Sequence, residues 1–300
     1  MYRPGSGKIG LFGSTMKIFY RLFLALCLVS SVDVLLFARK LRSGGNSVPV
    51  KRVVALTSLG ADLVASLDRE VLVGVPGTSL TKNDNRYVGI KRISSGRSQP
   101  NVESIVSLEP DLVIGATGFH SKVLGSLERL GIPTLAFKID RWNRLENAVE
   151  VLSRRIPNDG VLQSRLSRVC PPISSSQRVK KSKTSVLILA GIAPKLSPNK
   201  QSWSGSLLER RGLVNATDSL PGKSQFSGYI TMSNERLLSV RPGKVLVVNP
   251  SGGVSREQQS LRKFFPALAA GDFISMDYYG LINPGSLKSI SKACAKLLSL

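Results

Sequence analysis

The stretch NVESIVSLEPDLVIG, from Asn101 to Gly115, has a second copy in this chain, SNERLLSVRPGKVLV, from Ser233 to Val247. Four polar or proline anchors match at a constant offset of 132 residues: Asn101 with Ser233, Glu103 with Glu235, Ser107 with Ser239, and Pro110 with Pro242. A pattern that repeats in one register indicates two related units in one chain. We therefore expect two similar lobes with a cleft between them.

Each copy predicts a short capped helix followed by a buried strand. Asn101 and Ser233 are residue types that favour helix N-caps. Glu103 and Glu235 fall in the first helical turn, where the helix dipole favours a carboxylate. A proline then ends each helix, and the continuous apolar run after it predicts a strand buried on both faces.

The rest of the chain extends this alternation of strands and helices. Strands are predicted at 52–56, 71–75, 134–137, 185–190 and 273–277, and helices at 60–67, 122–130, 206–211 and from Ser286 onward. Apolar strands separated by helical stretches are typical of parallel sheets covered on both faces. Between Asn143 and Val169 a charged helical periodicity replaces the strand pattern. The predicted fold class is α/β, with two Rossmann-like lobes that have parallel sheets, a long connecting helix and a ligand cleft between the lobes.

This pattern divides the chain into four parts. The predicted boundaries are an export segment at 1–45, an amino-terminal α/β lobe at 46–140, a helical connector at 141–172 and a carboxyl-terminal α/β lobe at 173–300.

The amino terminus carries the pattern of an export signal. After Arg21 an eleven-residue apolar core runs from Leu22 to Val32, which is the length of a secretory signal and short for a membrane span. Asp33 interrupts a longer apolar stretch, so an uncleaved anchor is the alternative, and the residues around Cys27 partly resemble a lipoprotein cleavage site. We expect a periplasmic or otherwise extracytoplasmic protein, tethered to the membrane if this segment is retained.

Composition and charge limit the classes of function. Hydrophobic residues make up 42% of the 300 residues, which is ample for packed cores and excludes a disordered chain. The 42 Lys and Arg against 19 Asp and Glu give a formal net charge of +23. This excess suits nucleic acid, an anionic membrane surface or an anionic ligand. The export signal argues against nucleic acid, which stays a remote alternative.

Metal-binding and disulfide chemistry have few residues available. Cys170 and Cys294 could pair in an oxidising compartment, but we expect two buried thiols. The single histidine, His120, and the lack of clustered cysteines argue against a direct metal site. We expect His120 to be a packing or loop residue, with axial haem ligation as the alternative. No cofactor is expected, and a metal would arrive already chelated.

Common enzyme motifs are missing from the sequence. It has no G-x-G-x-x-G after Leu56, no G-x-x-x-x-G-K-[ST] and no G-x-S-x-G, and a single histidine leaves little general-base chemistry. We therefore expect a binding protein rather than an enzyme.

The ordered series of motifs resembles a known family. The stretches are RVVALTSLGADLVASLDREVLVGV at 52–75, VESIVSLEPDLVIGA at 102–116, LERLGIPTLAF at 127–137, GSLLERRGLVN at 205–215 and ITMSNERLLSVRPGKVLVVN at 230–249. Together they are similar to the substrate-binding proteins of ABC importers for ferric siderophores, cobalamin and haem. This resemblance covers the chain from Val50 onward. It implies two Rossmann-like lobes joined by a rigid helix, a ligand in the cleft and delivery to a membrane permease.

The resemblance also implies a role for the paired glutamates. Carboxylates at the positions of Glu103 and Glu235 would dock onto arginines of the two permease subunits. The alternative is that both carboxylates only complement the dipoles of their helices.

Ligand contacts are expected in the loops at the carboxyl ends of the strands. Aromatic rings there could stack on planar parts of a chelate, and cations could neutralise its carboxylates or catecholates. For each aromatic the alternative is core packing. The candidate ligand-binding residues are Ser58, Arg97, Phe119, Arg141, Trp142, Lys195, Trp203, Tyr229, Tyr278 and Tyr279.

These features predict a monomeric, exported binding component of an ABC importer. Its ligand is expected to be a small-molecule iron chelate, either ferric citrate or a siderophore, with cobalamin or haem as the alternative. The net charge of +23 favours an anionic chelate over neutral cobalamin.

Overall fold

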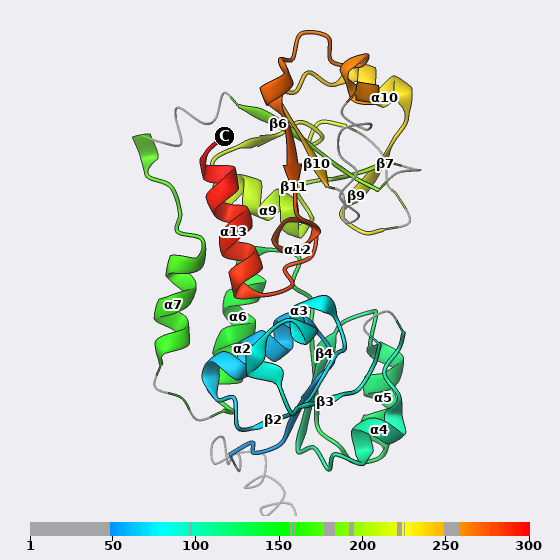
Figure 1. Cartoon of the computed structure of the whole chain (residues 1–300), viewed down its shortest axis with the longest axis vertical. Helices are drawn as coiled ribbons and strands as arrows, with labels where there is room; N and C mark the ends of the chain where they lie inside the picture. The colour runs from blue at the N-terminus through cyan, green and yellow to red at the C-terminus, as the bar shows by residue number, and fades with distance from the viewer. Residues whose placement is uncertain are drawn as a thin grey trace, which may run out of the picture. The chain divides into compact units, whose positions relative to one another are not determined.

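Two β-sheets organise the part of the chain that the structure describes, as Figure 1 shows. The structure is a computed structural model that describes residues 49–95, 98–156, 158, 160–176, 184–191, 195–220, 224, 226–248 and 259–300. Residues Pro49–Leu300 form one compact unit. The predicted export segment at 1–45 lies outside the described residues. Within the described ranges no helix is long and apolar enough to span a membrane.

The first sheet is built from parallel strands, as predicted. Its order is β3-β2-β1-β4-β5, and all neighbouring pairs are parallel. The strands are β1 (Val53–Ala55), β2 (Leu72–Val75), β3 (Lys91–Arg92), β4 (Leu112–Ala116) and β5 (Thr134–Phe137). The helical segments between them are α2 (Ser58–Leu67), α3 (Ser79–Lys82), η1 (Asn85–Tyr87), α4 (Val102–Val106) and α5 (Ser121–Arg129). The central strand β1 is buried along its whole length, because helices cover both faces of a parallel sheet.

The second sheet is mixed rather than wholly parallel, which corrects the prediction for this lobe. Its order is β11-β10-β6-β7-β9, with β8 also paired to β6. The strands are β6 (Ser185–Ala190), β7 (Lys195–Pro198), β8 (Val214–Asn215), β9 (Tyr229–Met232), β10 (Lys244–Val248) and β11 (Phe273–Met276). Strand β7 runs antiparallel to β6 and to β9. The few residues between Ala190 and Lys195 are too short for a parallel crossover, which takes about a dozen.

The repeated stretch forms the same pair of elements in both lobes. The first copy is α4 followed by β4, and the second is α10 (Asn234–Ser239) followed by β10. Asn101 Oδ1 accepts a hydrogen bond from Ser104 N at 3.1 Å, and Ser233 Oγ accepts one from Arg236 N at 3.3 Å. Both predicted N-caps are confirmed. Strands β4 and β10 each lie between two other strands of their sheet.

The predicted long connecting helix is instead a pair of helices. These are α6 (Trp142–Ser153) and α7 (Val161–Val169). The Asn158 side chain donates hydrogen bonds to Ser153 O at 2.9 Å and Ile156 O at 2.8 Å, which satisfies carbonyls at the end of α6. Gly160 then adopts a left-handed conformation, with φ of 75°, before α7 begins.

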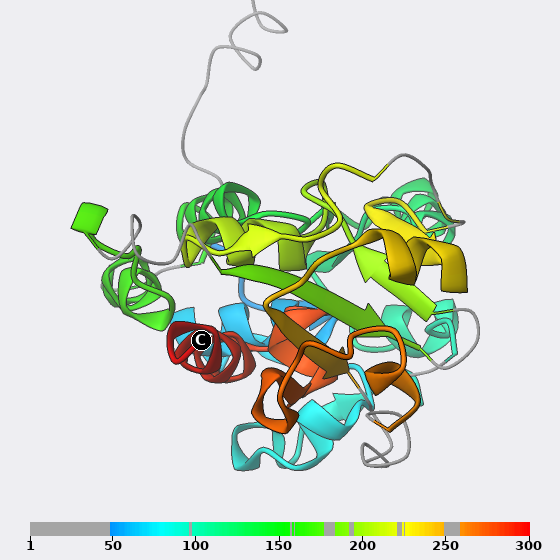
Figure 2. The same cartoon turned by 90° about the horizontal axis from the view of Figure 1, so that it is seen from above.

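A helix from the end of the chain packs beside this connector. Helix α13 (Leu287–Leu298) begins one residue after the predicted start at Ser286, which is its N-cap, and α13 packs against α7 and α2. Figure 2 shows α13 and α7 side by side. The other short helical elements of this lobe are α9 (Trp203–Arg210), η2 (Ala270–Asp272) and α12 (Tyr278–Leu281).

Cys170 and Cys294 form a disulfide, so the expectation of two buried thiols is wrong. The two Cα atoms are 5.6 Å apart, within the ordinary range for a disulfide. The bond joins the end of α7 to the middle of α13. The packing of α13 against α7 brings the two cysteines together. The sequence around each cysteine does not predict that packing.

Candidate ligand groove between the lobes

A groove of about 1770 Å³ lies where the amino-terminal lobe faces the helices of the carboxyl-terminal half. Its walls come from α2, α3 and η1 on one side and from α7, α12 and α13 on the other. We call it the interlobe groove. Three of the candidate ligand residues line it: Ser58, Tyr278 and Tyr279.

The amino-terminal wall of the groove is rich in hydroxyl groups at helix starts. Thr57 caps α2 by accepting a hydrogen bond from Gly60 N at 3.0 Å. The next residue, Ser58, lies within 2.7 Å of the Thr78 hydroxyl, and Thr78 in turn caps α3. Gly60 is required here, because a Cβ would lie 2.9 Å from Thr57 Oγ1. This packing fixes Ser58 at the edge of the groove.

The opposite wall is formed by residues 277–286, which join β11 to α13 and which we call the tyrosine loop. The rings of Tyr278 and Tyr279 meet edge to face, with centroids 5.4 Å apart. Three successive carbonyls of the loop accept side-chain hydrogen bonds from its own lobe. The bonds are from Trp203 Nε1 to Gly280 O at 2.8 Å, from Ser204 Oγ to Leu281 O at 2.6 Å and from Tyr229 Oη to Ile282 O at 3.5 Å.

The phenols at this wall stay protonated at neutral pH. Burial raises the pKa of Tyr278 above its ordinary value and raises the pKa of Tyr229 to about 12. Both groups are therefore neutral phenols, and the Tyr278 side chain, which is partly exposed, can donate a hydrogen bond to a ligand.

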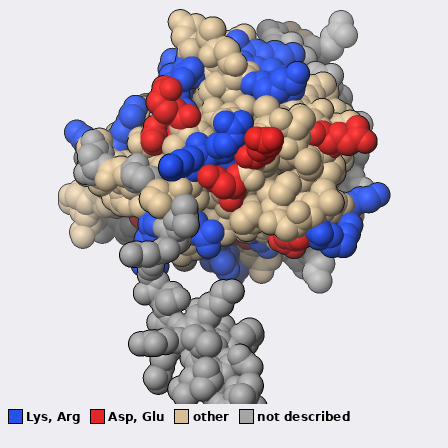
Figure 3. Space-filling model, turned by 90° about the horizontal axis from the view of Figure 1, so that it is seen from below, with Lys and Arg blue, Asp and Glu red and all other residues tan. Residues whose placement is uncertain are grey.

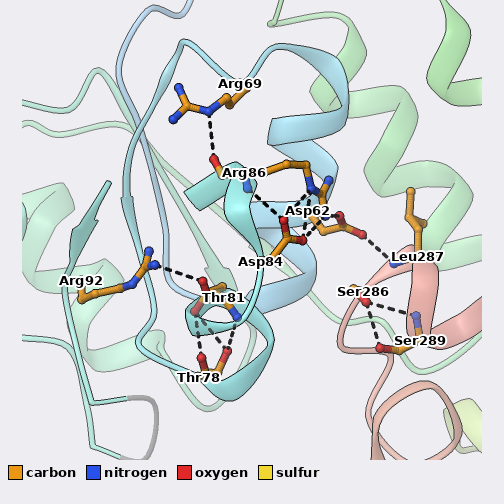
Figure 4. Close-up of polar contacts among 10 residues, drawn as sticks. All are labelled: Asp62, Arg69, Thr78, Thr81, Asp84, Arg86, Arg92, Ser286, Leu287 and Ser289. Carbon is orange, nitrogen blue, oxygen red and sulfur yellow. Dashed lines mark hydrogen bonds and ion pairs between the residues drawn. The ribbon is translucent and has the colours of Figure 1, made fainter. Parts of the chain in front are cut away.

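Each acidic residue of the groove forms an ion pair, and Asp62 and Asp84 share one cation. Arg86 Nη2 lies 2.7 Å from Asp62 Oδ1 and 2.7 Å from Asp84 Oδ2, as Figure 4 shows. Hydrogen bonding from Arg86 holds the pKa of Asp84 below its ordinary value. Asp277 pairs with Lys292 at 2.6 Å.

Three further cations line the same groove. Arg165 and Arg168 belong to α7, and Lys288 belongs to the first turn of α13. All three side chains are exposed, and none makes an ion pair with a residue in the described ranges. The lining includes five Lys and Arg side chains against three Asp side chains, so the net charge of the groove is positive.

The two tryptophans are packing residues in this structure. Trp142 and Trp203 are 6% and 3% exposed, and their rings stack with centroids 6.2 Å apart. The Arg210 guanidinium lies 4.0 Å from the Trp142 ring centroid, and Trp142 Nε1 donates to Glu146 at 2.6 Å. The stack joins α6 to α9, so little of either ring is left for a ligand.

Other candidate residues lie away from the interlobe groove. The Phe119 side chain is 61% exposed and packs edge-on against His120. Arg141 lies beside Asp140 at 3.8 Å, and Lys195 starts β7. None of these three lines the groove, and Arg97 lies outside the described residues.

His120 has the surroundings of a packing residue. Its side chain is buried, and Nδ1 accepts a hydrogen bond from Ala116 N at 3.1 Å. Burial lowers its pKa, so the ring is neutral at neutral pH. Across the described part of the chain, no three His, Cys, Asp or Glu side chains are close enough to hold a metal ion.

The two glutamates of the repeat occupy matching positions. Glu103 and Glu235 lie in the first turns of α4 and α10, and both are exposed. Neither carboxylate makes an ion pair with a described residue.

Sequence reasoning missed the charged network at the groove. Asp62, Asp84 and Arg86 were not among the predicted site residues. A signal for Asp62 was available, since it is the single acidic residue in the otherwise apolar predicted helix at 60–67. A buried carboxylate on such a helix requires a partner, which the sequence does not identify.

Comparison with known proteins confirms the resemblance seen in the motifs. Residues 53–158 match the periplasmic binding protein family. The Fe(3+) dicitrate-binding periplasmic protein FecB of Escherichia coli is 27% identical over 160 residues. That alignment covers 51% of this chain and 50% of FecB, so the chain matches about half the length of this curated relative. The matched family consists of binding proteins, in agreement with the expectation that the chain is not an enzyme.

Solved structures share the two-lobed fold. An ABC transporter substrate-binding protein from Listeria monocytogenes has a TM-score of 0.65 at 21% identity, covering 83% of this chain and 97% of that one. The vitamin B12 binding protein BtuF of Vibrio cholerae has a TM-score of 0.63 at 17% identity, covering 84% and 96%. The haem complex of IsdE from Staphylococcus aureus has a TM-score of 0.61 at 21% identity, covering 83% and 97%. At these identities the likeness establishes the fold alone.

Proposed function

From the match of residues 53–158 to the periplasmic binding protein family, we propose that this chain captures an anionic iron chelate outside the cytoplasm and delivers it to an ABC importer. The ligand class is ferric citrate or a carboxylate siderophore. The observation that carries the proposal is the interlobe groove, which has tyrosines on one wall, hydroxyl groups on the other and more cations than acids in its lining.

The charge of the groove supports an anionic ligand over a neutral one. Arg165, Arg168 and Lys288 form no ion pair with a described residue, although the charge of Lys288 helps to lower the pKa of Asp84. A carboxylate-rich chelate would gain charge-assisted hydrogen bonds from such groups, and arginine can bind a carboxylate in a bidentate manner. The similarity to FecB, a ferric dicitrate-binding protein, supports this choice.

The candidate residues divide into two proposed roles. Tyr278, Tyr279 and Ser58 would contact the chelate directly, because they line the groove. Trp203 and Tyr229 would hold the tyrosine loop through its carbonyls, and Trp142 would support Trp203 by stacking. Contacts from the remaining candidates stay proposals that would extend the site beyond the groove: Arg97, Phe119, Arg141 and Lys195.

Delivery requires a surface that the permease recognises. We propose that Glu103 and Glu235 dock onto the two permease subunits, since both are exposed and unpaired among described residues at equivalent positions of the repeat. Reversing both charges should abolish transport and leave chelate binding unchanged. Unimpaired transport by a double variant that still binds its chelate would exclude this role.

Tryptophan fluorescence provides the test of capture. One of the two tryptophans in the sequence, Trp203, donates a hydrogen bond to the tyrosine loop, so it reports on binding there. The purified protein is titrated with ferric citrate, hydroxamate and catecholate siderophores, haemin and cobalamin, with the iron-free chelators as controls. We expect saturable quenching by ferric citrate or a carboxylate siderophore, with an affinity that falls as salt is raised.

Two variants distinguish the effect of a cation in the groove on chelate binding from the effect of the net charge of the whole protein. Arg168→Gln removes a groove cation, and Arg144→Gln removes an exposed cation on α6 that does not line the groove. We expect only Arg168→Gln to weaken binding, by about tenfold for one charge-assisted hydrogen bond. Equal effects of both variants, or a response to cobalamin or haemin alone, would overturn the anionic-chelate assignment.

A further inference from the structure

The tyrosine loop is held from both lobes, although it belongs to the carboxyl-terminal one. On its own side, Trp203 and Ser204 donate to the carbonyls of Gly280 and Leu281. On the other side, the loop ends where Leu287 begins α13, and Leu287 N donates to Asp62 Oδ2 of α2 at 2.6 Å. This hydrogen bond spans 225 residues of sequence and crosses from one lobe to the other.

Asp62 is buried and held in place by its own partners. Its side chain is 4% exposed, and Arg86 Nη2 lies 2.7 Å from its other oxygen. Figure 4 shows the carboxylate between the Arg86 guanidinium and the start of α13. A buried carboxylate requires such partners, because an unpaired charge would be strongly destabilising there. One oxygen is thus fixed to η1 and the other to α13.

Gly285, two residues before Leu287, connects the start of α13 to the tyrosine loop by packing against Tyr279. A Cβ at position 285 would lie 2.7 Å from Tyr279 Cδ1, so the Tyr279 ring packs directly on the glycine backbone. A shift of the start of α13 would therefore act on Tyr279 through this contact. On the opposite wall, Ser58 and Asp62 lie four residues apart on the same face of α2.

We propose that Asp62 is a positioning residue of the ligand site, which sets the tyrosine loop at a fixed place opposite Ser58 by binding the first amide of α13. Its effect on affinity rests on the proposed function, whereas its effect on the loop does not depend on any ligand. A residue that only capped α13 would stabilise the helix without ordering residues 277–286.

Hydrogen exchange of the full chain, measured without ligand, distinguishes positioning from capping. Asp62→Ala removes the acceptor, while Arg86 keeps its second partner, Asp84. We expect faster exchange at Leu287 and also at Gly280, whose amide donates to Asn283 O within the loop. The increase should be about tenfold or more, the scale expected for loss of a buried charge-assisted hydrogen bond.

Two further variants control the result. Asp62→Asn keeps one acceptor oxygen, which can accept from Leu287 N when its NH2 group faces Arg86, and Arg86 retains Asp84 as a partner. This variant should therefore bring exchange in the loop most of the way back to the wild-type rate. Ser286→Ala removes the N-cap hydroxyl that accepts a hydrogen bond from Ser289 N in the first turn of α13. It should therefore speed exchange at Ser289 and leave exchange at Gly280 unchanged. If Asp62→Ala affects Leu287 but not Gly280, or if Ser286→Ala opens the loop equally, Asp62 is only a cap and the proposal is wrong.

Chelate titration completes the test. Asp62→Ala should weaken binding about tenfold, and Asp62→Asn should recover most of it. If the wild-type protein binds no chelate, the proposed function fails while the exchange data still decide the role of Asp62. If the loop opens in Asp62→Ala and the affinity stays at the wild-type value, the loop position does not govern the site and this inference is overturned.

Discussion

Gly285 is a residue at which the tyrosine loop leaves no room for a side chain. Its φ of 67° lies in the left-handed region, and an added Cβ would be 2.7 Å from Tyr279 Cδ1 and 2.8 Å from Leu80 Cδ1. An alanine here would combine backbone strain with overpacking between the lobes.

The predicted effect of Gly285→Ala is a loss of about 2–4 kcal/mol of stability, measured by urea unfolding. Gly131→Ala is the matched control, because Gly131 has a φ of 79° and a Cβ added there would meet no heavy atom within 4 Å among the described residues. It should lose only the backbone contribution, about 1 kcal/mol. Equal losses in the two variants would show that the contact with Tyr279 does not constrain the loop.

The residue scale is also where the sequence was least informative. Tyr278 and Tyr279 were predicted at the site because they follow a strand, and they line the groove. Trp142 followed the same rule, yet it is buried against Trp203. Exposure of an aromatic side chain depends on which distant helix packs on it, and that information is not local to the sequence.

At the scale of helices and strands, the disulfide that links α7 to α13 should have a large effect on the free energy of unfolding. It closes a loop with a sequence separation of 124 residues, which restricts the unfolded chain far more than the folded one. The Cys170→Ser, Cys294→Ser double variant should lose about 2–5 kcal/mol of unfolding free energy.

Urea unfolding with and without a reducing agent tests this. Reductant should lower the stability of the wild-type protein to that of the double variant and should not affect the double variant. Identical unfolding of the oxidised wild-type protein and the double variant would mean that the bond contributes nothing.

Elements with strong local signals were the most predictable. Thr134–Phe137 and Ser185–Ala190 form strands at the predicted bounds, and Ser286 caps the last helix. The short elements α3, η1 and β3 were missed, because stretches of two to four residues carry too little periodicity. The antiparallel strand β7 was missed for the same reason.

For the molecule as a whole, the free energy of unfolding should depend on pH through the protonation of His120. Burial lowers the pKa of His120 in the folded protein, so below the ordinary histidine pKa of about 6.5 the unfolded chain binds more protons than the folded one. The contribution of His120 to the free energy of unfolding is therefore fully present at neutral pH. It is lost as the pH falls from about 6.5 toward the lowered pKa of His120 in the folded protein.

The sequence contains one histidine, which makes the assignment direct. We expect the unfolding free energy to decrease between about pH 7 and pH 5 in the wild-type protein, and His120→Asn to flatten this decrease. A matching slope in His120→Asn would contradict the buried, neutral state of the ring.

The net charge of the whole chain does not show where positive charge is concentrated on its surface. The face shown in Figure 3 carries acidic side chains interspersed with basic ones, rather than an unbroken basic surface. The net charge of +23 therefore did not by itself locate a binding site. The excess of cations over acids in the lining of the interlobe groove is a local property that the net charge of the chain does not indicate.

The disulfide gives the carboxyl-terminal lobe an unusual covalent topology. Cys170 precedes β6 and Cys294 follows β11, so every strand of the second sheet lies within one closed covalent ring. A single backbone cut anywhere in that ring leaves the two fragments attached to each other. A lobe nicked once by a protease would accordingly migrate as one molecule until it is reduced.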